Sequence, residues 1–89
     1  MTVCKRVVYS GRVQGVGFRY TARGLARRFS VAGYVRNLAD GSVELVVEGE
    51  AEQVNAFLGA VADQMGDYIR DSTVRDESPG NYRGFEIRF

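Results

Sequence analysis

Two amphipathic stretches separated by strand-like segments constrain the fold of this sequence more than any other feature. Apolar residues recur at helical spacing over residues 18–29 and again over residues 54–65, where Gly66 follows. Segments rich in β-branched and aromatic residues, or alternating apolar with polar positions, flank these stretches: residues 3–10, 31–38, 42–48, 68–75 and 85–89. The predicted order is therefore strand, helix, strand, strand, helix, strand, with a short extra strand at the C-terminal end.

This order predicts an α+β fold, the ferredoxin-like α/β sandwich, in which an antiparallel sheet carries both helices on one face. Right-handed crossovers place the first strand centrally and bring the loop before the first helix to one end of the sheet. Asp40-Gly41 predicts a hairpin turn, and residues 31–38 are expected to form an edge strand that could pair with another chain. Residues 1–89 are expected to form a single domain. Because proteins with this fold have many different functions, the function must be inferred from the residues of the site.

The numbers of cysteine and histidine residues and the hydropathy of the chain exclude several classes of protein. Cys4 is the only cysteine and the chain has no histidine, which excludes an internal disulfide and a thiolate metal cluster within one chain. No apolar run approaches the ~18 residues of a membrane span, and Lys5 and Arg6 are not followed by the apolar stretch of a signal peptide. We therefore expect a cytoplasmic protein with no cofactor, no metal and no membrane partner.

The charges are unevenly distributed, although the net charge is only +1. Residues 1–45 contain eight Lys or Arg and two Asp or Glu, whereas residues 46–89 contain four and nine. The first half therefore favours an anionic ligand. Arg19 is the strongest candidate to bind it because of its position in the chain, and Arg12 and Arg36 are weaker candidates.

Residues 11–19, with the sequence GRVQGVGFR, join the first strand to the first helix and have the features of an anion-binding loop. Three glycines let the backbone approach a bound group and adopt conformations that a Cβ forbids, so that successive amide N–H groups can face one phosphate. The positive end of the following helix favours the same anion. Arg19 adds a planar guanidinium that suits phosphate oxygens.

Three better-known phosphate motifs do not fit this loop. A Walker A loop needs a lysine and a hydroxyl where Phe18 and Arg19 follow the last glycine, and a dinucleotide fingerprint needs a glycine in place of Tyr20. A cysteine phosphatase would need a thiol six residues before the arginine, where Val13 stands. A loop without nucleophile, metal or histidine can assist only reactions that are already easy, such as cleavage of a mixed carboxylic-phosphoric anhydride.

The sequence resembles the acylphosphatase family. Residues 11–19 match the first signature of that family, and residues 33–44, GYVRNLADGSVE, resemble the second. The length, the element order and the terminal FEIRF also fit, although Tyr34 stands where tryptophan is frequent. The resemblance implies a small stand-alone hydrolase that converts acyl phosphates to a carboxylate and inorganic phosphate, which would act as product or inhibitor. We expect a monomer, because nothing in the sequence demands more.

The resemblance also implies the roles of individual residues. Arg19 would bind the phosphoryl group and Asn37 would orient the attacking water, with no strong base because the transition state is loose. Gln14 is expected to contribute its backbone more than its side chain, and Asp40 and Gly41 to shape the hairpin that presents Asn37. The backbone amides implied to surround the phosphate oxygens are those of Gln14, Gly15, Val16, Gly17, Phe18 and Arg19.

Two alternatives remain. The first is an acylphosphatase-like domain that handles carbamoyl phosphate, as at the front of hydrogenase-maturation proteins, which are much longer chains. The second is a ferredoxin-like RNA-binding module, because residues 83–89 superficially resemble a motif of such domains. That motif fails at Glu86 and Ile87, and the chain lacks a strong excess of positive charge. We therefore expect no nucleic-acid partner.

Overall fold

The computed structural model describes all 89 residues, and its elements follow the predicted order with a single 3₁₀ turn added before the fourth strand. The elements are β1 (Thr2–Gly11), α1 (Phe18–Ala26), β2 (Val31–Asn37), β3 (Val43–Glu50), α2 (Ala51–Met65), the 3₁₀ turn η1 (Gly66–Tyr68), β4 (Ile69–Asp76) and β5 (Phe85–Arg88). The first helix was predicted to extend to Phe29, but α1 ends at Ala26. The backbone N–H groups of Arg28 and Phe29 donate to carbonyls three residues back, which tightens the last turn.

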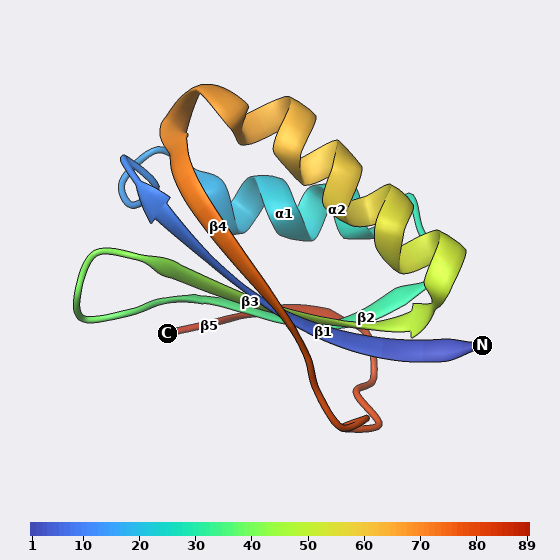
Figure 1. Ribbon diagram of the computed structural model, residues 1–89. Helices are drawn as coiled ribbons and strands as arrows, with labels where there is room; N and C mark the ends of the chain where they lie inside the picture. The colour runs from blue at the N-terminus through green and yellow to red at the C-terminus, as the bar shows by residue number, and fades with distance from the viewer.

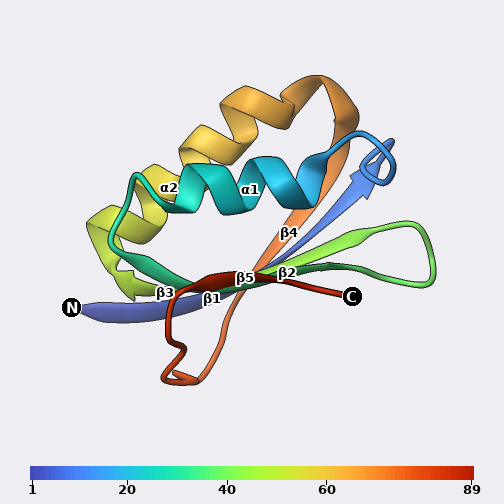
Figure 2. The same ribbon diagram turned by 180° about the vertical axis from the view of Figure 1, so that it is seen from behind.

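The five strands form one sheet in the order β4-β1-β3-β2-β5, with β1 in the interior as predicted. The pairs β1–β3, β1–β4 and β2–β3 are antiparallel, but β5 pairs with β2 in parallel. The four main strands are antiparallel as predicted, but the expectation that residues 31–38 form an edge strand was wrong, because β5 covers the free side of β2. After β4, residues 77–84 return past the sheet and deliver β5 to the opposite edge, where it covers β2 (Figure 2).

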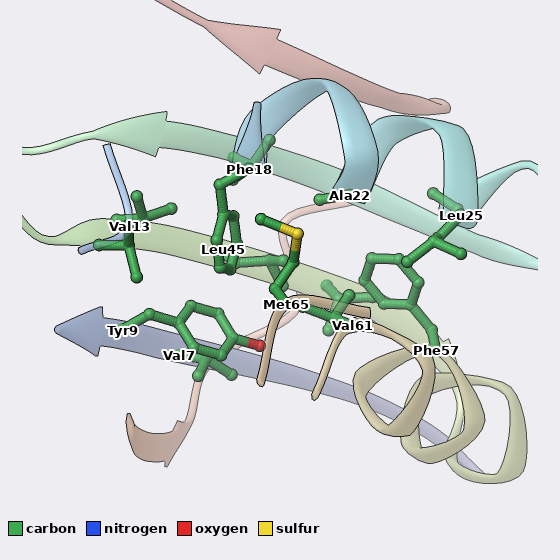
Figure 3. Packing of buried hydrophobic residues seen from close by; sticks show 14 of the residues in the cluster. Val7, Tyr9, Val13, Phe18, Ala22, Leu25, Leu45, Phe57, Val61 and Met65 are labelled. Carbon is green, nitrogen blue, oxygen red and sulfur yellow. The ribbon is translucent and has the colours of Figure 1, made fainter. Parts of the chain in front are cut away.

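Both helices lie on one face of the sheet, and the core fills the space between them and the strands (Figures 1 and 3). The helices contribute residues at helical spacing, and the strands contribute alternate residues that point to the same side. The largest fully buried side chains include Phe18 from α1, Phe57 from α2 and Leu45 from β3. No helix of the structure is long and apolar enough to cross a membrane.

The opposite face of the sheet contains a buried carboxylate. Glu44 is 3% exposed and accepts hydrogen bonds from the Nε atoms of Arg6 and Arg36, each at 2.6 Å. These bonds lower the pKa of Glu44 although its burial raises it. Because Arg6, Glu44 and Arg36 belong to β1, β3 and β2, the three charges join the strands at the centre of the sheet.

Two glycines allow the chain to pass where a side chain could not. At Gly11 the strand register shifts and φ is 124°, and a Cβ there would lie 2.5 Å from the Tyr68 carbonyl oxygen. At Gly33 φ is 146°, and a Cβ would lie 1.9 Å from the Val46 carbonyl oxygen. Gly11 ends β1 and begins the loop to α1, so the irregularity determines where this loop leaves the sheet.

Candidate active site

The loop between β1 and α1 is held at both ends by buried side chains. Val13 is 1% exposed and Phe18 is 2% exposed, and both belong to the hydrophobic core (Figure 3). Between them Gly15 and Gly17 are exposed and have φ values of 78° and 79°. Since side chains rarely tolerate these values, the glycines let the loop curl outward between its two anchors.

The amide N–H groups of this loop have no partners within the protein. Arg12 N–H donates to the Tyr68 carbonyl before the loop, and Thr21 N–H donates to the Gly17 carbonyl after it. None of the N–H groups of residues 13–20 donates to a protein acceptor, and α1 has no side-chain cap at Gly17. A cluster of free amides at the positive end of a helix is a binding site suited to an anion.

A small pocket of about 100 Å³ lies at this loop. It brings Arg19 and Asn37 together, although they come from different elements. Of the other residues implied to surround the phosphate, Gly15, Gly17 and Phe18 line the pocket, whereas Gln14 and Val16 do not. The complete lining is Val13, Gly15, Gly17, Phe18, Arg19, Tyr20 and Asn37.

Arg19 forms no ion pair in the structure. It is the second residue of α1, and its guanidinium carbon lies 4.9 Å from the centre of the Phe89 ring. A contact with an aromatic face leaves the N–H groups of the guanidinium free, because it uses none of them as hydrogen-bond donors. Arg19 therefore retains both its charge and its donors for an anion in the pocket.

Asn37 is the last residue of β2 and pairs with Val43 of β3. Side chains alternate along a strand, so Asn37 shares the helix-covered face of the sheet with Val35, which is fully buried. The half-buried Asn37 side chain forms no hydrogen bond within the protein. Its amide can both donate to and accept from one bound water.

The hairpin after Asn37 is closed by a compact set of hydrogen bonds. Leu38 N–H donates to the Ser42 carbonyl at 2.9 Å, and Gly41 N–H donates to the Leu38 carbonyl at 3.2 Å. The backbone N–H and the hydroxyl of Ser42 both donate to the Asp40 carboxylate, at 3.0 and 2.6 Å, and these bonds lower the pKa of Asp40. Gly41 has a φ of 95°. Asp40 and Gly41 thus shape the turn, as the sequence indicated.

The side chain of Gln14 has a contact that the sequence did not reveal. Its Nε2 atom donates to the carbonyl oxygens of Leu38 at 2.8 Å and Ser42 at 2.9 Å. The loop and the β2–β3 hairpin lie at the same end of the sheet (Figure 1), which makes this contact possible. No local signal could have predicted it, since the two carbonyls lie 24 and 28 residues along the chain.

The weaker arginine candidates lie elsewhere. Arg36 pairs with Glu44 on the face of the sheet opposite the helices. Arg12 is exposed and lies at a separate hollow with Arg70. Tyr20, which is 56% exposed, lines the pocket and stacks with Arg23. No group of three or more Cys, Asp or Glu side chains is arranged to hold a metal ion.

The fold and the loop together define an α+β sandwich whose first strand leads into a loop of free amide N–H groups suited to an anion. The model of the acylphosphatase family matches residues 5–87. An acylphosphatase from Petrotoga mobilis is 43% identical over 88 residues, covering 98% of this chain and 99% of the relative. The chain therefore belongs to the acylphosphatase family and is an enzyme of that family, as the resemblance of residues 11–19 and 33–44 predicted.

Solved structures agree with this assignment. The crystal structure of acylphosphatase from Bacillus subtilis matches 100% of both chains with a TM-score of 0.88 and 33% identity. The crystal structure of HypF from T. kodakarensis matches 99% of this chain but only 12% of that protein, with a TM-score of 0.84 and 31% identity. The predicted ferredoxin-like α/β sandwich with a short extra C-terminal strand is thus confirmed.

Proposed function

We propose that this chain hydrolyses acyl phosphates, which are carboxylic-phosphoric mixed anhydrides, to a carboxylate and inorganic phosphate in the pocket between Arg19 and Asn37. The observation that carries the proposal is the set of unpartnered N–H groups from residue 14 to residue 19 beside the unpaired guanidinium of Arg19. Fixed donors of this kind stabilise charge on phosphoryl oxygens without having to reorganise during the reaction. Family membership supports the same reaction class.

The phosphoryl group would bind with its oxygens on the loop amides and the guanidinium. Its charge in the transition state spreads over the equatorial oxygens, where dipoles and a cation act most strongly. The carboxylate is a good leaving group and departs with the electron pair of its bond to phosphorus. The amides in this role are those of Gln14, Gly15, Val16, Gly17, Phe18 and Arg19.

Asn37 would position the attacking water opposite the leaving carboxylate. The water oxygen forms the new bond to phosphorus while the bond to the acyl oxygen breaks, and the protons of the water pass to phosphate and solvent. An amide side chain can orient this water because it offers a donor and an acceptor. No strong base is required, because a loose transition state has little bond formation to the nucleophile.

A second candidate substrate is carbamoyl phosphate, which carries the same anhydride bond. We include it because the sequence also resembles the acylphosphatase-like domain that handles carbamoyl phosphate at the front of hydrogenase-maturation proteins. Both substrates present a phosphoryl group, so both would bind at the same site. Their relative turnover then depends on contacts with the acyl or carbamoyl group, for which the exposed ring of Tyr20 in the pocket lining is a candidate.

The proposal is tested by turnover of benzoyl phosphate and carbamoyl phosphate in excess EDTA, with a phosphate monoester as the control substrate. We expect anhydride hydrolysis that EDTA does not inhibit and little monoester hydrolysis. Arg19→Ala should abolish both turnover and competitive inhibition by phosphate. Asn37→Ala should lower kcat and spare phosphate inhibition. Arg23→Ala, four residues further along α1 and outside the pocket, is the matched control.

Absence of anhydride turnover in the wild-type protein would refute the proposed reaction. If Asn37→Ala weakened phosphate inhibition as much as Arg19→Ala, the division of roles between the two residues would be wrong. A loss of turnover in Arg23→Ala equal to that in Arg19→Ala would show that general positive charge, and not a guanidinium in the pocket, carries the effect.

A further inference from the structure

Gln14 belongs to the anion-binding loop, but its side chain contacts the hairpin and not the pocket. Its Nε2 atom lies 2.8 Å from the Leu38 carbonyl oxygen and 2.9 Å from the Ser42 carbonyl oxygen. Both partners are acceptors only, so the amide group must present both of its hydrogens to them. The side chain is therefore held in one orientation by two neutral hydrogen bonds.

The same two carbonyls close the hairpin that follows Asn37. The Ser42 carbonyl accepts from Leu38 N–H, and the Leu38 carbonyl accepts from Gly41 N–H. The side chain of Gln14 thus joins the hydrogen-bond network of the hairpin. One member of this network is Leu38, the residue directly after Asn37. No other hydrogen bond or ion pair joins residues 12–19 to residues 37–42.

We propose that Gln14 is a positioning residue, which fixes the distance between the phosphate-binding loop and the water-orienting amide of Asn37. This inference rests on the proposed function. The reaction needs the water and the phosphorus in line at close range, and a displacement of about 1 Å at a reacting group can cost about 100-fold in rate. The Gln14 backbone would bind phosphate through its N–H group, whereas its side chain acts only through the hairpin.

Gln14→Met tests the inference, because methionine keeps the length of the side chain and removes both donors. We expect kcat to fall roughly 10- to 100-fold, while the inhibition constant for inorganic phosphate changes less than about threefold. Gln53→Met is the matched control. Gln53 also bridges two segments by one side-chain bond, accepting from Ser30 N–H at 2.9 Å. It lies in the first turn of α2, at the opposite end of the sheet (Figure 1), and should leave kcat unchanged.

A double variant distinguishes positioning from a purely structural role. If Gln14 acts through Asn37, then Gln14→Met combined with Asn37→Ala should be no slower than Asn37→Ala alone. Multiplicative losses in the double variant would overturn the inference. A normal kcat in folded Gln14→Met would also overturn it, as would a loss of phosphate inhibition as large as the loss of kcat. Should the methionine variant fail to fold, Gln14→Leu also lacks both donors and adds no charge, and the same outcomes apply.

Hydrogen exchange provides a readout that does not need catalysis. The amides of Leu38 and Gly41 should exchange faster in Gln14→Met than in the wild-type protein and be unchanged in Gln53→Met. Unchanged exchange at both amides would refute the link between loop and hairpin. If the wild-type protein hydrolysed no acyl phosphate, the proposed function would fail, and the exchange measurement would still decide whether Gln14 holds the hairpin.

Discussion

Replacing the buried carboxylate on the helix-free face should destabilise the protein far more than replacing an exposed one. Glu44 accepts two hydrogen bonds of 2.6 Å from charged donors and its side chain is only 4% exposed. Breaking a buried ion pair costs about 3–5 kcal/mol. Here the side chains of Arg6 and Arg36 remain 27% and 48% exposed, so water can solvate them after the change. For Glu44→Gln we therefore expect a loss of about 2 kcal/mol in the free energy of unfolding.

The measurement is urea unfolding at pH 7 of Glu44→Gln beside Glu86→Gln. Glu86 pairs with Arg88 at 3.2 Å and its side chain is 64% exposed, so its loss should cost less than about 0.5 kcal/mol. Because the pKa of Glu44 is lowered on folding, its contribution to the free energy of unfolding is present above the unfolded pKa and is lost as the pH falls through the folded pKa. The difference in unfolding free energy between the wild-type protein and Glu44→Gln should therefore shrink in acid. Equal losses for both variants at pH 7 would refute the reasoning.

Three further predictions concern the backbone, the core and the hairpin. Gly33→Ala should prevent stable folding, because its Cβ would lie 1.9 Å from a backbone oxygen at a φ of 146°, whereas Gly59→Ala, with open space in the middle of α2, should raise the melting temperature. Phe57→Ala should cost about 3–5 kcal/mol in denaturant unfolding, since this side chain is fully buried against the sheet. The pKa of the Asp40 carboxyl should lie below that of an ordinary aspartate because Ser42 donates to it, and NMR of the Ser42 amide measures this titration.

The sequence predicted the helices and the order of the elements better than it predicted the edge of the sheet. Helical and strand periodicities are local, so the element order could be read directly, and the right-handedness of the crossovers then placed β1 in the interior. The docking of β5 beside β2 depends on how residues 77–84 cross the sheet, and no local pattern encodes that route. The two family signatures predicted that Arg19 and Asn37 act at one site, and in the structure both line one pocket.

Side-chain contacts between different elements could not be predicted from the sequence. Two such contacts hold β2, the strand that ends in Asn37. On one face Arg36, the residue before Asn37, is bonded to Glu44 across the β2–β3 pair. Beyond the end of the strand Leu38, the residue after Asn37, is bonded to Gln14. If both contacts serve to position Asn37, then Glu44→Gln should also lower kcat, by less than Gln14→Met, since only the Gln14 hydrogen bonds reach the loop of residues 11–19. A Glu44→Gln protein that is less stable but has normal kcat at 20 °C below its melting temperature would assign Glu44 to stability alone and leave the positioning to Gln14.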